Sequence, residues 1–471
     1  MDFFMQYLFL TLITMIASVY VLQKRGTKTL PPGSFGWPLV GETYQFLFIK
    51  IEHFIQERVN KYSSEIFRTS ILGEPTVVLC GPGANKFVST NETKLVEVWY
   101  MKTQRRLFNI PDRTHGAKPK PKPKQEAASA APVKSLGILK PEGIARYMGN
   151  MIESTIHQHF MTHWAGKTEV KVYPLVKAFS LTLVCQFFLG LDKPILATEF
   201  DNLHSGIYSV PVNFPGSTYR RALKAAAAIR EEIQFQIKEK IDAFSKGQVV
   251  DDLLAHVVGS EQGGKYVPKM AISNIIMGLM NSSYIPIAIN LAFMIKHIGQ
   301  RPDIYQKIVS EHADVTKSKG SGTALDWDSM QKLKYTWAVA QETMRLYPTA
   351  PGVFREVLTD ITYEGYTIPK GWKIFWALVG TNKNPNYFPE PESFDPSRFE
   401  GNNFPAPYTW IPFGAGPRSC PGKDYVRFVV LSFIHVLVSK FKWEAILPDE
   451  KVSGVLIPTP TEGIPIRLHP H

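Results

Sequence analysis

The sequence predicts a mainly α-helical protein with small β-sheets, held behind an N-terminal transmembrane helix. Three observations predict this class: an uncharged apolar stretch near the N-terminus, several long runs with helical periodicity, and short β-rich runs bounded by glycine turns. The overall composition, with 44% hydrophobic and 20% charged residues, is ordinary for a globular protein.

The N-terminal stretch has the length of a membrane anchor. Phe3 to Leu22 is uncharged and 20 residues long, enough to span a hydrocarbon core of about 30 Å as a helix. Lys24, Arg25 and Lys28 follow at once, so the positive-inside rule places the rest of the chain on the cytosolic side. We therefore expect an anchor over 1–23, a basic and proline-rich connector over 24–38, and a globular domain over 39–471.

Several elements can be predicted along that domain. Residues 65–81 indicate two strands with a turn at Gly73-Glu74-Pro75, and 357–377 a small sheet. Residues 219–244 form a strongly amphipathic helical pattern, 267–297 an apolar buried helix, and 424–441 a final apolar helix. Pro348 should end the helix before it.

Residues 112–132 differ from the rest of the chain. Their alternating Lys-Pro pattern favours extended polyproline conformation and cannot build a core. We interpret this Lys-Pro segment as a disordered insert, although docking of an acidic partner or a lipid is an alternative.

The net charge restricts the classes of partner that we expect, and the cysteine content restricts the disulfide bonds. The net charge of +12 fits a membrane surface or an acidic partner protein, and no basic run interleaved with aromatic residues suggests a nucleic-acid face. Three cysteines in 471 residues are not a disulfide framework. Cys80 and Cys185 lie in apolar runs, as core cysteines do, whereas Cys420 stands among Gly, Pro, Arg and Ser.

The stretch "FGAGPRSCPGK", from Phe413 to Lys423, has the composition of a special loop. Its glycines and prolines favour a tight irregular turn whose backbone N–H groups can face the sulfur of Cys420 and stabilise a thiolate. Arg418 adds positive charge nearby. A thiolate presented ahead of a long apolar helix suits an axial ligand to haem iron.

These residues make the sequence similar to the cytochromes P450. "FGAGPRSC" matches the haem-ligand loop F-G-x-G-x-R-x-C of that family, "ETMR" (Glu342, Arg345) matches its E-x-x-R, and Phe394 to Phe399 matches F-x-P-x-R-F. The resemblance implies the P450 fold, haem b as cofactor and Cys420 as the ligand of its iron, with Phe413 also against the haem.

Five charged residues receive roles from this resemblance. Glu342, Arg345 and Arg398 are expected to form a buried, charge-paired network that braces the cysteine loop, because burial of any one unpaired would be costly. Arg418 and Arg355 are expected to hold the haem propionates, for which the planar fork of arginine is suited.

Longer matching stretches indicate a subgroup within the cytochromes P450. "LGEPTVVLCGPGANKF", "VPVNFPGSTYRRAL", "YTIPKGWKIFWA" and "APYTWIPFGAGPRSCPGKDY" resemble plant enzymes that hydroxylate cyclic terpenoids, both triterpene oxidases and taxane-type diterpene hydroxylases. This implies a single-pass anchor in the endoplasmic reticulum, electrons from NADPH through the cytochrome P450 reductase, and a hydrophobic terpenoid substrate.

One motif of the family is missing. The buried helix should carry A/G-G-x-D/E-T, whose acid and alcohol deliver the protons needed to split dioxygen. A gapless count places Ser282 and Ser283 at the small residues, Tyr284 next, Ile285 at the acid and Pro286 at the threonine. A proline there is expected to sit at a kink of the helix.

Two further positions differ from the family. The count places Pro132, with Lys134 close by, where a basic residue contacts a propionate, and Thr381-Asn382 where the family has a Thr-His pair. We therefore expect haem to bind less tightly than is usual in the family.

Three hypotheses follow for the function. The first is a terpenoid monooxygenase with atypical proton delivery, in which Asn281, Ser282 and Ser283, ordered water or a substrate hydroxyl supply protons. The second is a haem-thiolate isomerase or dehydratase that does not use dioxygen, although its haem loop lacks the insert of such relatives. The third is a non-catalytic scaffold for other pathway enzymes. We favour the first, because the haem and bracing motifs are intact.

Overall fold

The computed structural model describes residues 11, 30–38, 40–62, 64–111, 140–192, 194, 196–248, 252–261, 268–319 and 325–471. Apart from Thr11, the predicted anchor over 1–23 lies outside these residues, as do the basic part of the connector and the Lys-Pro segment.

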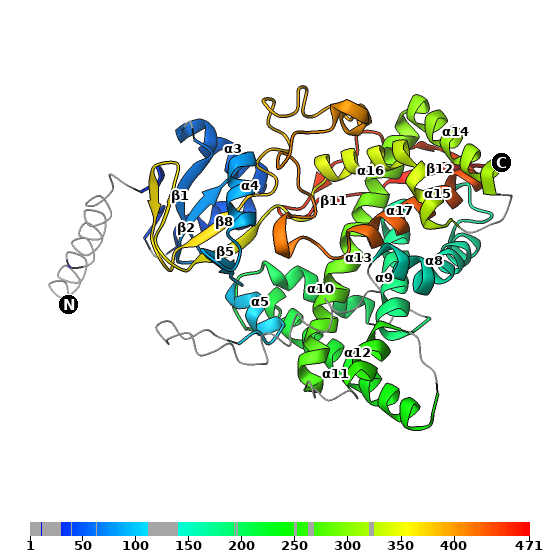
Figure 1. The fold of residues 1–471 in the computed structure, drawn as a ribbon, viewed down its shortest axis with the longest axis horizontal. Coiled ribbons are helices and arrows are strands. Elements are labelled where there is room, and N and C mark those ends of the chain that lie inside the picture. The colour runs from blue at the N-terminus through cyan, green and yellow to red at the C-terminus, as the bar shows by residue number, and fades with distance from the viewer. Residues whose placement is uncertain are drawn as a thin grey trace.

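The described chain has a smaller part built on a sheet and a larger helical part (Figure 1). The sheet has five strands in the order β1-β2-β8-β5-β3, and β2 and β8 pair in parallel. Its strands are β1 (Ile66–Ile71), β2 (Glu74–Leu79), β3 (Val96–Val98), β5 (Val353–Val357) and β8 (Lys373–Trp376). Around it lie α2 (Thr43–Phe48), α3 (Ile51–Tyr62), α4 (Gly81–Thr90) and α5 (Lys102–Leu107).

The helical part holds the long helices. They are α8 (Pro141–His163), α9 (Val172–Leu189), α10 (Ala197–Ile207), α11 (Thr218–Ser245), α12 (Leu253–Glu261), α13 (Lys269–Gln300), α14 (Pro302–Lys319), α15 (Trp327–Lys332), α16 (Lys334–Leu346) and α17 (Lys423–Lys440). A three-stranded sheet, β4-β12-β9, and two short pairs complete the fold: β4 (Glu169–Lys171), β6 (Ile361–Tyr363), β7 (Tyr366–Ile368), β9 (Phe441–Ala445), β10 (Val452–Ser453), β11 (Thr459–Pro460) and β12 (Pro465–Pro470).

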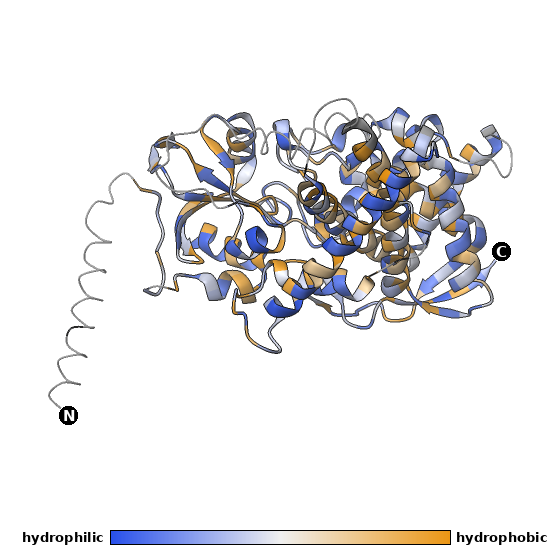
Figure 2. Ribbon diagram, turned by 90° about the horizontal axis from the view of Figure 1, so that it is seen from below, coloured by the Kyte–Doolittle hydropathy of each residue, from blue (hydrophilic) through white to orange (hydrophobic). Residues whose placement is uncertain are grey.

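The largest core lies among α8, α9, α11, α13 and α17. Figure 2 shows apolar residues concentrated in the middle of this helical part. The five-stranded sheet has a separate apolar cluster on each face, because successive residues of its inner strands point to opposite sides. Phe375 of β8 belongs to one cluster, and Ile374 and Trp376 belong to the other.

Most of the predicted elements are confirmed, and one turn is corrected. The helices predicted over 219–244 and 424–441 are α11 and α17, and α16 ends at Leu346, before Pro348. The turn between β1 and β2 is Leu72-Gly73, both with positive φ, and not Gly73-Glu74-Pro75. A two-residue turn with positive φ at both positions matches the twist of a hairpin, so Glu74 and Pro75 join β2.

Helix α13 runs as one helix through Pro286. Proline lacks the N–H that would bond the carbonyl of Ser282, so the helix loses one bond there. Nearby side chains supply other bonds: the Ser180 hydroxyl on α9 donates to the Tyr284 carbonyl at 2.9 Å, and Ser283 donates to the Leu279 carbonyl at 2.6 Å. Neither bond reaches the Ser282 carbonyl, and what the structure shows is that the helix continues through Pro286.

Two described helices, α9 and α13, are long and apolar enough to cross a membrane by composition. Both are mostly buried inside the protein, so they are core helices. Nearer the N-terminus, the connector is tied to the sheet, since Arg68 of β1 donates its backbone N–H to the Pro32 carbonyl at 2.8 Å.

Candidate active site

The loop before α17 presents Cys420 in a constrained turn. Its backbone N–H donates to the Phe413 carbonyl at 2.8 Å, and Gly414 and Gly416 both have positive φ, which glycine adopts without strain. A Cβ at Gly416 would stand 2.4 Å from the Ser89 carbonyl oxygen of α4, so the loop also needs glycine for its close approach.

Two features of the surroundings shift the pKa of the Cys420 thiol in opposite directions. Its side chain is accessible, yet the atoms around it desolvate the sulfur, which raises its pKa above the ordinary value. The Gly422 backbone N–H, a donor of the kind the loop composition predicted, lowers the pKa but does not outweigh burial. The protein alone therefore favours the neutral thiol, and the charge of a bound iron is what would favour the thiolate.

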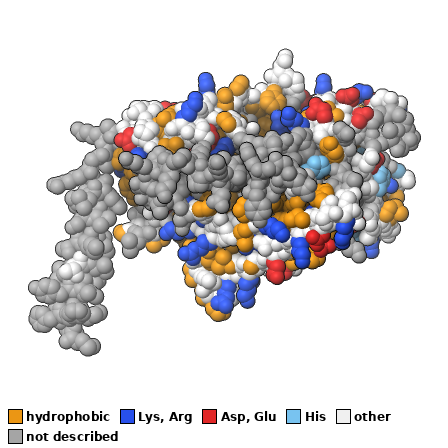
Figure 3. All heavy atoms as spheres, turned by 60° about the horizontal axis from the view of Figure 1, so that its bottom comes forward, with side chains coloured by type: hydrophobic (Ala, Val, Ile, Leu, Met, Phe, Trp, Pro, Cys, Tyr) orange, Lys and Arg blue, Asp and Glu red, His pale blue; other side chains and the backbone are white. Residues whose placement is uncertain are grey.

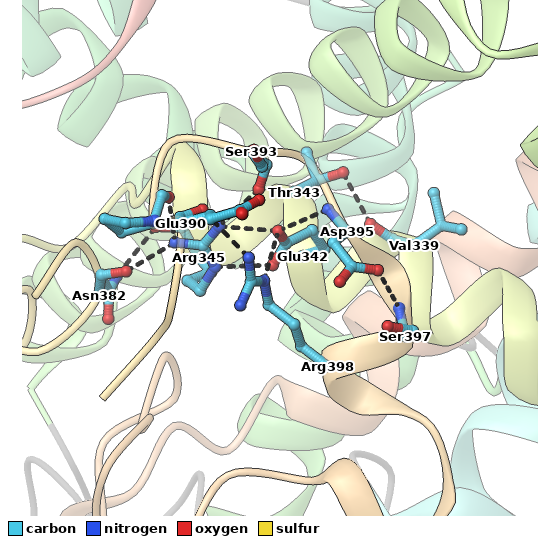
Figure 4. A network of polar contacts seen from close by, with 11 residues as sticks. Val339, Glu342, Thr343, Arg345, Asn382, Glu390, Ser393, Asp395, Ser397 and Arg398 are labelled. Carbon is cyan, nitrogen blue, oxygen red and sulfur yellow. Dashed lines mark hydrogen bonds and ion pairs between the residues drawn. The ribbon is translucent and has the colours of Figure 1, made fainter. Parts of the chain in front are cut away.

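Glu342 and Arg345 of α16 form a fully buried ion pair (Figure 4). Arg345 donates Nε and Nη2 to the two carboxylate oxygens of Glu342, each at 2.7 Å. Its remaining N–H groups donate to the carbonyls of Asn382, Pro391 and Ser393. All five donors of the guanidinium are thus used, which removes the main cost of burying this charge.

Arg398 belongs to the same network. Its Nε lies 3.6 Å from Oε1 of Glu342, and its Nη2 donates to the Glu390 carbonyl at 3.1 Å. The Asp395 backbone N–H also donates to Glu342. Burial raises the pKa of Glu342, and Arg345 opposes that rise. The structure thus brings together the three residues predicted to brace the cysteine loop.

Arg355 and Arg418 meet at a residue that the sequence did not single out. Glu92 follows α4, and its carboxylate accepts from Nε of Arg355 at 2.6 Å and lies 3.7 Å from Nε of Arg418. Its side chain is 2% exposed. Glu92 stands in an ordinary polar stretch, "STNETK", whose pattern fits a surface loop, so nothing local marks it as an interior charge.

A small open recess lies between α13, the end of α16 and the start of α17. Pro286 and Asn290 of α13 face Phe413 and Val426 across it. The position predicted for the missing threonine therefore lies in the wall of the same recess as the first residue of the cysteine loop.

The serines before Pro286 use their hydroxyl protons on their own helix. Ser282 and Ser283 both donate to the Leu279 carbonyl, at 3.0 and 2.6 Å. Such bonds to the preceding turn bend a helix slightly. Ser282 is exposed and Ser283 partly so, which leaves their oxygens able to accept a further hydrogen bond.

Asn281 turns to a different neighbour. It is 5% exposed and its side chain contacts His204 of α10, where it raises the pKa of that histidine against the larger lowering by burial. Asn281 thus faces α10, whereas the serines bond back to the preceding turn of α13. The structure does not gather the three proposed distal residues at one point.

The side chain of Asn382 is also already hydrogen-bonded to another part of the chain. Its amide donates to the Arg345 carbonyl at 3.1 Å, so this side chain serves α16. Thr381 donates to the carbonyl of Thr409. Lys134, the other residue considered as a propionate partner, lies outside the described residues.

The described residues fit a haem group. A free, accessible thiol, two arginines and a recess lined mostly by apolar side chains match a planar apolar cofactor with a metal and two carboxylates. Fold and donor set together define a haem-thiolate protein.

The chain belongs to the cytochrome P450 family, whose model matches residues 31–463. The predicted fold and class of enzyme, a P450 monooxygenase, are thereby confirmed. Membership implies haem iron and electrons that come from NADPH through a reductase.

Curated plant proteins are similar over nearly the whole chain. A "Beta-amyrin 28-monooxygenase" of Vitis vinifera is 40% identical and covers 100% of this chain and 99% of its own length. A "Beta-amyrin 6-beta-monooxygenase" of Solanum lycopersicum is 40% identical, covering 94% of this chain and 93% of its own. These relatives support the terpenoid hydroxylase hypothesis and give no support to the isomerase or the scaffold.

A solved structure has the same fold at lower identity. The retinoic acid-bound cyanobacterial CYP120A1 superposes with a TM-score of 0.79 and is 24% identical, covering 94% of this chain and all of its own.

Proposed function

We propose that this protein hydroxylates a cyclic terpenoid, and that its substrate is a triterpenoid of the β-amyrin type. The observation that carries the proposal is the 40% identity to a β-amyrin monooxygenase over the full length of both chains. The free Cys420 and the intact buried bracing network are consistent with a working haem enzyme.

Cys420 is proposed as the axial ligand of the haem iron, with Phe413 packed beside it and Arg355 and Arg418 holding the propionates. Bound haem with a thiolate ligand supplies the activation of dioxygen. The protein's own part is to present the sulfur from a rigid loop, to keep the recess apolar, and to fix the orientation of the carboxylates.

The residues of α13 are proposed to set how protons reach the recess. Ile285 and Pro286 have no exchangeable side-chain proton, and the serine hydroxyls already donate to Leu279. Proton delivery is therefore assigned to a water molecule or to a hydroxyl of the substrate. The water donates a hydrogen bond to the oxygen of Ser282 or Ser283. Asn281, which was expected to share this role, lies against His204 of α10 and is not assigned a part in proton delivery.

The electron donor is proposed to be NADPH–cytochrome P450 reductase. A net charge of +12 favours encounter with an acidic docking surface, chiefly through the rate of association.

The protein is proposed to be a single-pass protein of the endoplasmic reticulum, with an anchor over 1–23, a connector over 24–38 and a cytosolic domain over 39–471. Val210, Val212 and Phe214 are all about half exposed, and so is Phe48 of α2. Their chain neighbours Pro211 and Leu47 line one cavity together, so the two exposed apolar segments lie near each other. Figure 3 shows apolar side chains gathered among lysines and arginines on the lower face of the molecule.

Turnover with labelled dioxygen tests the proposed reaction. Membranes holding the whole chain and a plant reductase are given NADPH, ¹⁸O₂ and a panel of triterpenoids and diterpenoids. We expect a hydroxylated β-amyrin-type product with one ¹⁸O atom, which the Cys420→Ser variant does not form. A rearranged product without ¹⁸O, or no product from any cyclic terpenoid, would contradict the proposal.

A further inference from the structure

Glu92 is a buried carboxylate placed between the two arginines proposed to hold the haem propionates. It lies just after α4, where Glu92 forms an isolated bridge with Val96 of β3. That strand pairs with β5, which carries Arg355 opposite Val98. Long-range strand pairing therefore brings this carboxylate to the arginine.

Its two oxygens have different surroundings. Oε2 accepts from Nε of Arg355 at 2.6 Å, whereas Oε1 lies 3.7 Å from Nε of Arg418, too far for a hydrogen bond. Arg355 also donates Nη1 to the Phe354 carbonyl and stacks 5.6 Å from the Trp376 ring centre. The guanidinium is thus held on three sides, while its Nη2 makes no hydrogen bond to any described residue.

The charges at this point do not balance a haem group. Two arginines and one carboxylate give a net charge of +1, and haem carries two propionates. Arg418, with a side chain 46% exposed, makes no hydrogen bond to the described residues. A buried negative charge acts over several ångströms because the interior screens it less than water does.

We propose that Glu92 is a positioning residue and counter-charge of the haem seat, which orients Arg355 for a propionate and lowers the reduction potential of the iron. Its charge opposes the arrival of an electron, so the oxidised iron is favoured. Its charge also competes with the propionates for the arginines, so it weakens the hold on haem. This inference rests on the proposed haem site.

The Glu92→Gln variant separates these roles, because glutamine keeps the shape and one acceptor oxygen but removes the charge. In the whole, haem-loaded chain we expect a more positive midpoint potential and several-fold slower loss of haem to apomyoglobin. The matched control is Glu356→Gln: this carboxylate is next to Arg355 in sequence but lies 3.3 Å from Lys373. The control should leave both quantities unchanged.

Glu92→Ala tests the positioning role. It removes both charge and acceptor, so we expect the same direction of potential shift but faster haem loss than in Glu92→Gln. An unchanged or more negative potential in Glu92→Gln overturns the counter-charge role, and equal haem loss in the two variants overturns the positioning role. The red-shifted Soret band of the reduced, CO-bound variants shows separately whether the haem-thiolate site itself is present.

Discussion

The two sides of the candidate haem site differ in how their polar side chains are hydrogen-bonded. On the Cys420 side, Arg345 uses all five of its donors, and Glu342 is bonded by a guanidinium and a backbone N–H. Across the recess, α13 presents Pro286, and its serines bond their own backbone. Glu342 and Arg345 thus have their polar groups paired, whereas the two serines of α13 before Pro286 offer no hydroxyl proton that is not already donated to the helix backbone.

The largest effect is expected from the cysteine itself. Cys420→Ser should abolish the red-shifted Soret band of the reduced, CO-bound protein and all turnover, because a hydroxyl is not a thiolate ligand. Cys185→Ala is the matched control, since that cysteine is buried in α9 away from the loop. A variant with serine at 420 that keeps the shifted band would show that another residue ligates the iron.

The buried network of Glu342, Arg345 and Arg398 should contribute several kcal/mol to the free energy of unfolding. Arg345→Leu leaves Glu342 buried without its partner, which costs about 3–5 kcal/mol. We expect a marked fall in thermal midpoint and in the fraction of chain that retains haem. Arg467→Ala, which removes an exposed pair with Glu169 and Glu444, should change neither. A thermal midpoint as high as that of the unmodified chain would refute the bracing role.

Most of this side could be predicted from sequence, because its motifs are local. The E-x-x-R spacing puts Glu342 and Arg345 one turn apart, and the glycines of the loop identify the Cys420 turn. Glu92 and Asn382 could not be predicted, since their partners come from β5 and α16 through long-range packing. The directions of the serine hydroxyls depend on side-chain torsions that residue type does not decide.

On the α13 side of the site, restoring the acid and the alcohol of the family motif should raise turnover. Ile285→Asp with Pro286→Thr is expected to raise product formed per NADPH about tenfold or more and to reduce release of hydrogen peroxide, because a positioned acid contributes 10²–10⁴ in rate. Pro286→Ala is the control, as it relieves the proline without adding a hydroxyl. Equal gains in both variants would mean that helix geometry, not the proton, limits turnover.

A smaller effect concerns acid stability, away from both sides of the recess. His312 of α14 contacts Nδ1 of His435 at 2.8 Å and the Thr336 hydroxyl at 3.0 Å, and that hydroxyl donates to Glu311. Burial, and then the neighbouring His435, lower the pKa of His312 to about 3.

The unfolded chain therefore binds a proton that the folded chain does not, between about pH 6.5 and pH 3. Stability should fall as pH decreases through this window, by up to about 1.4 kcal/mol per pH unit for this group. Thermal midpoints at about pH 7 and pH 5 should differ less in His312→Gln than in the exposed control His157→Gln. The same difference in both would exclude His312 as a source of acid sensitivity.

The central claim is that the chain holds haem through Cys420 despite the altered distal helix. The most direct measurement is the reduced, CO-bound difference spectrum of the whole chain in membranes, together with its haem content. We expect one haem per chain and the red-shifted Soret band of a thiolate ligand. Folded protein that binds haem without that band, or that binds no haem at all, would contradict it.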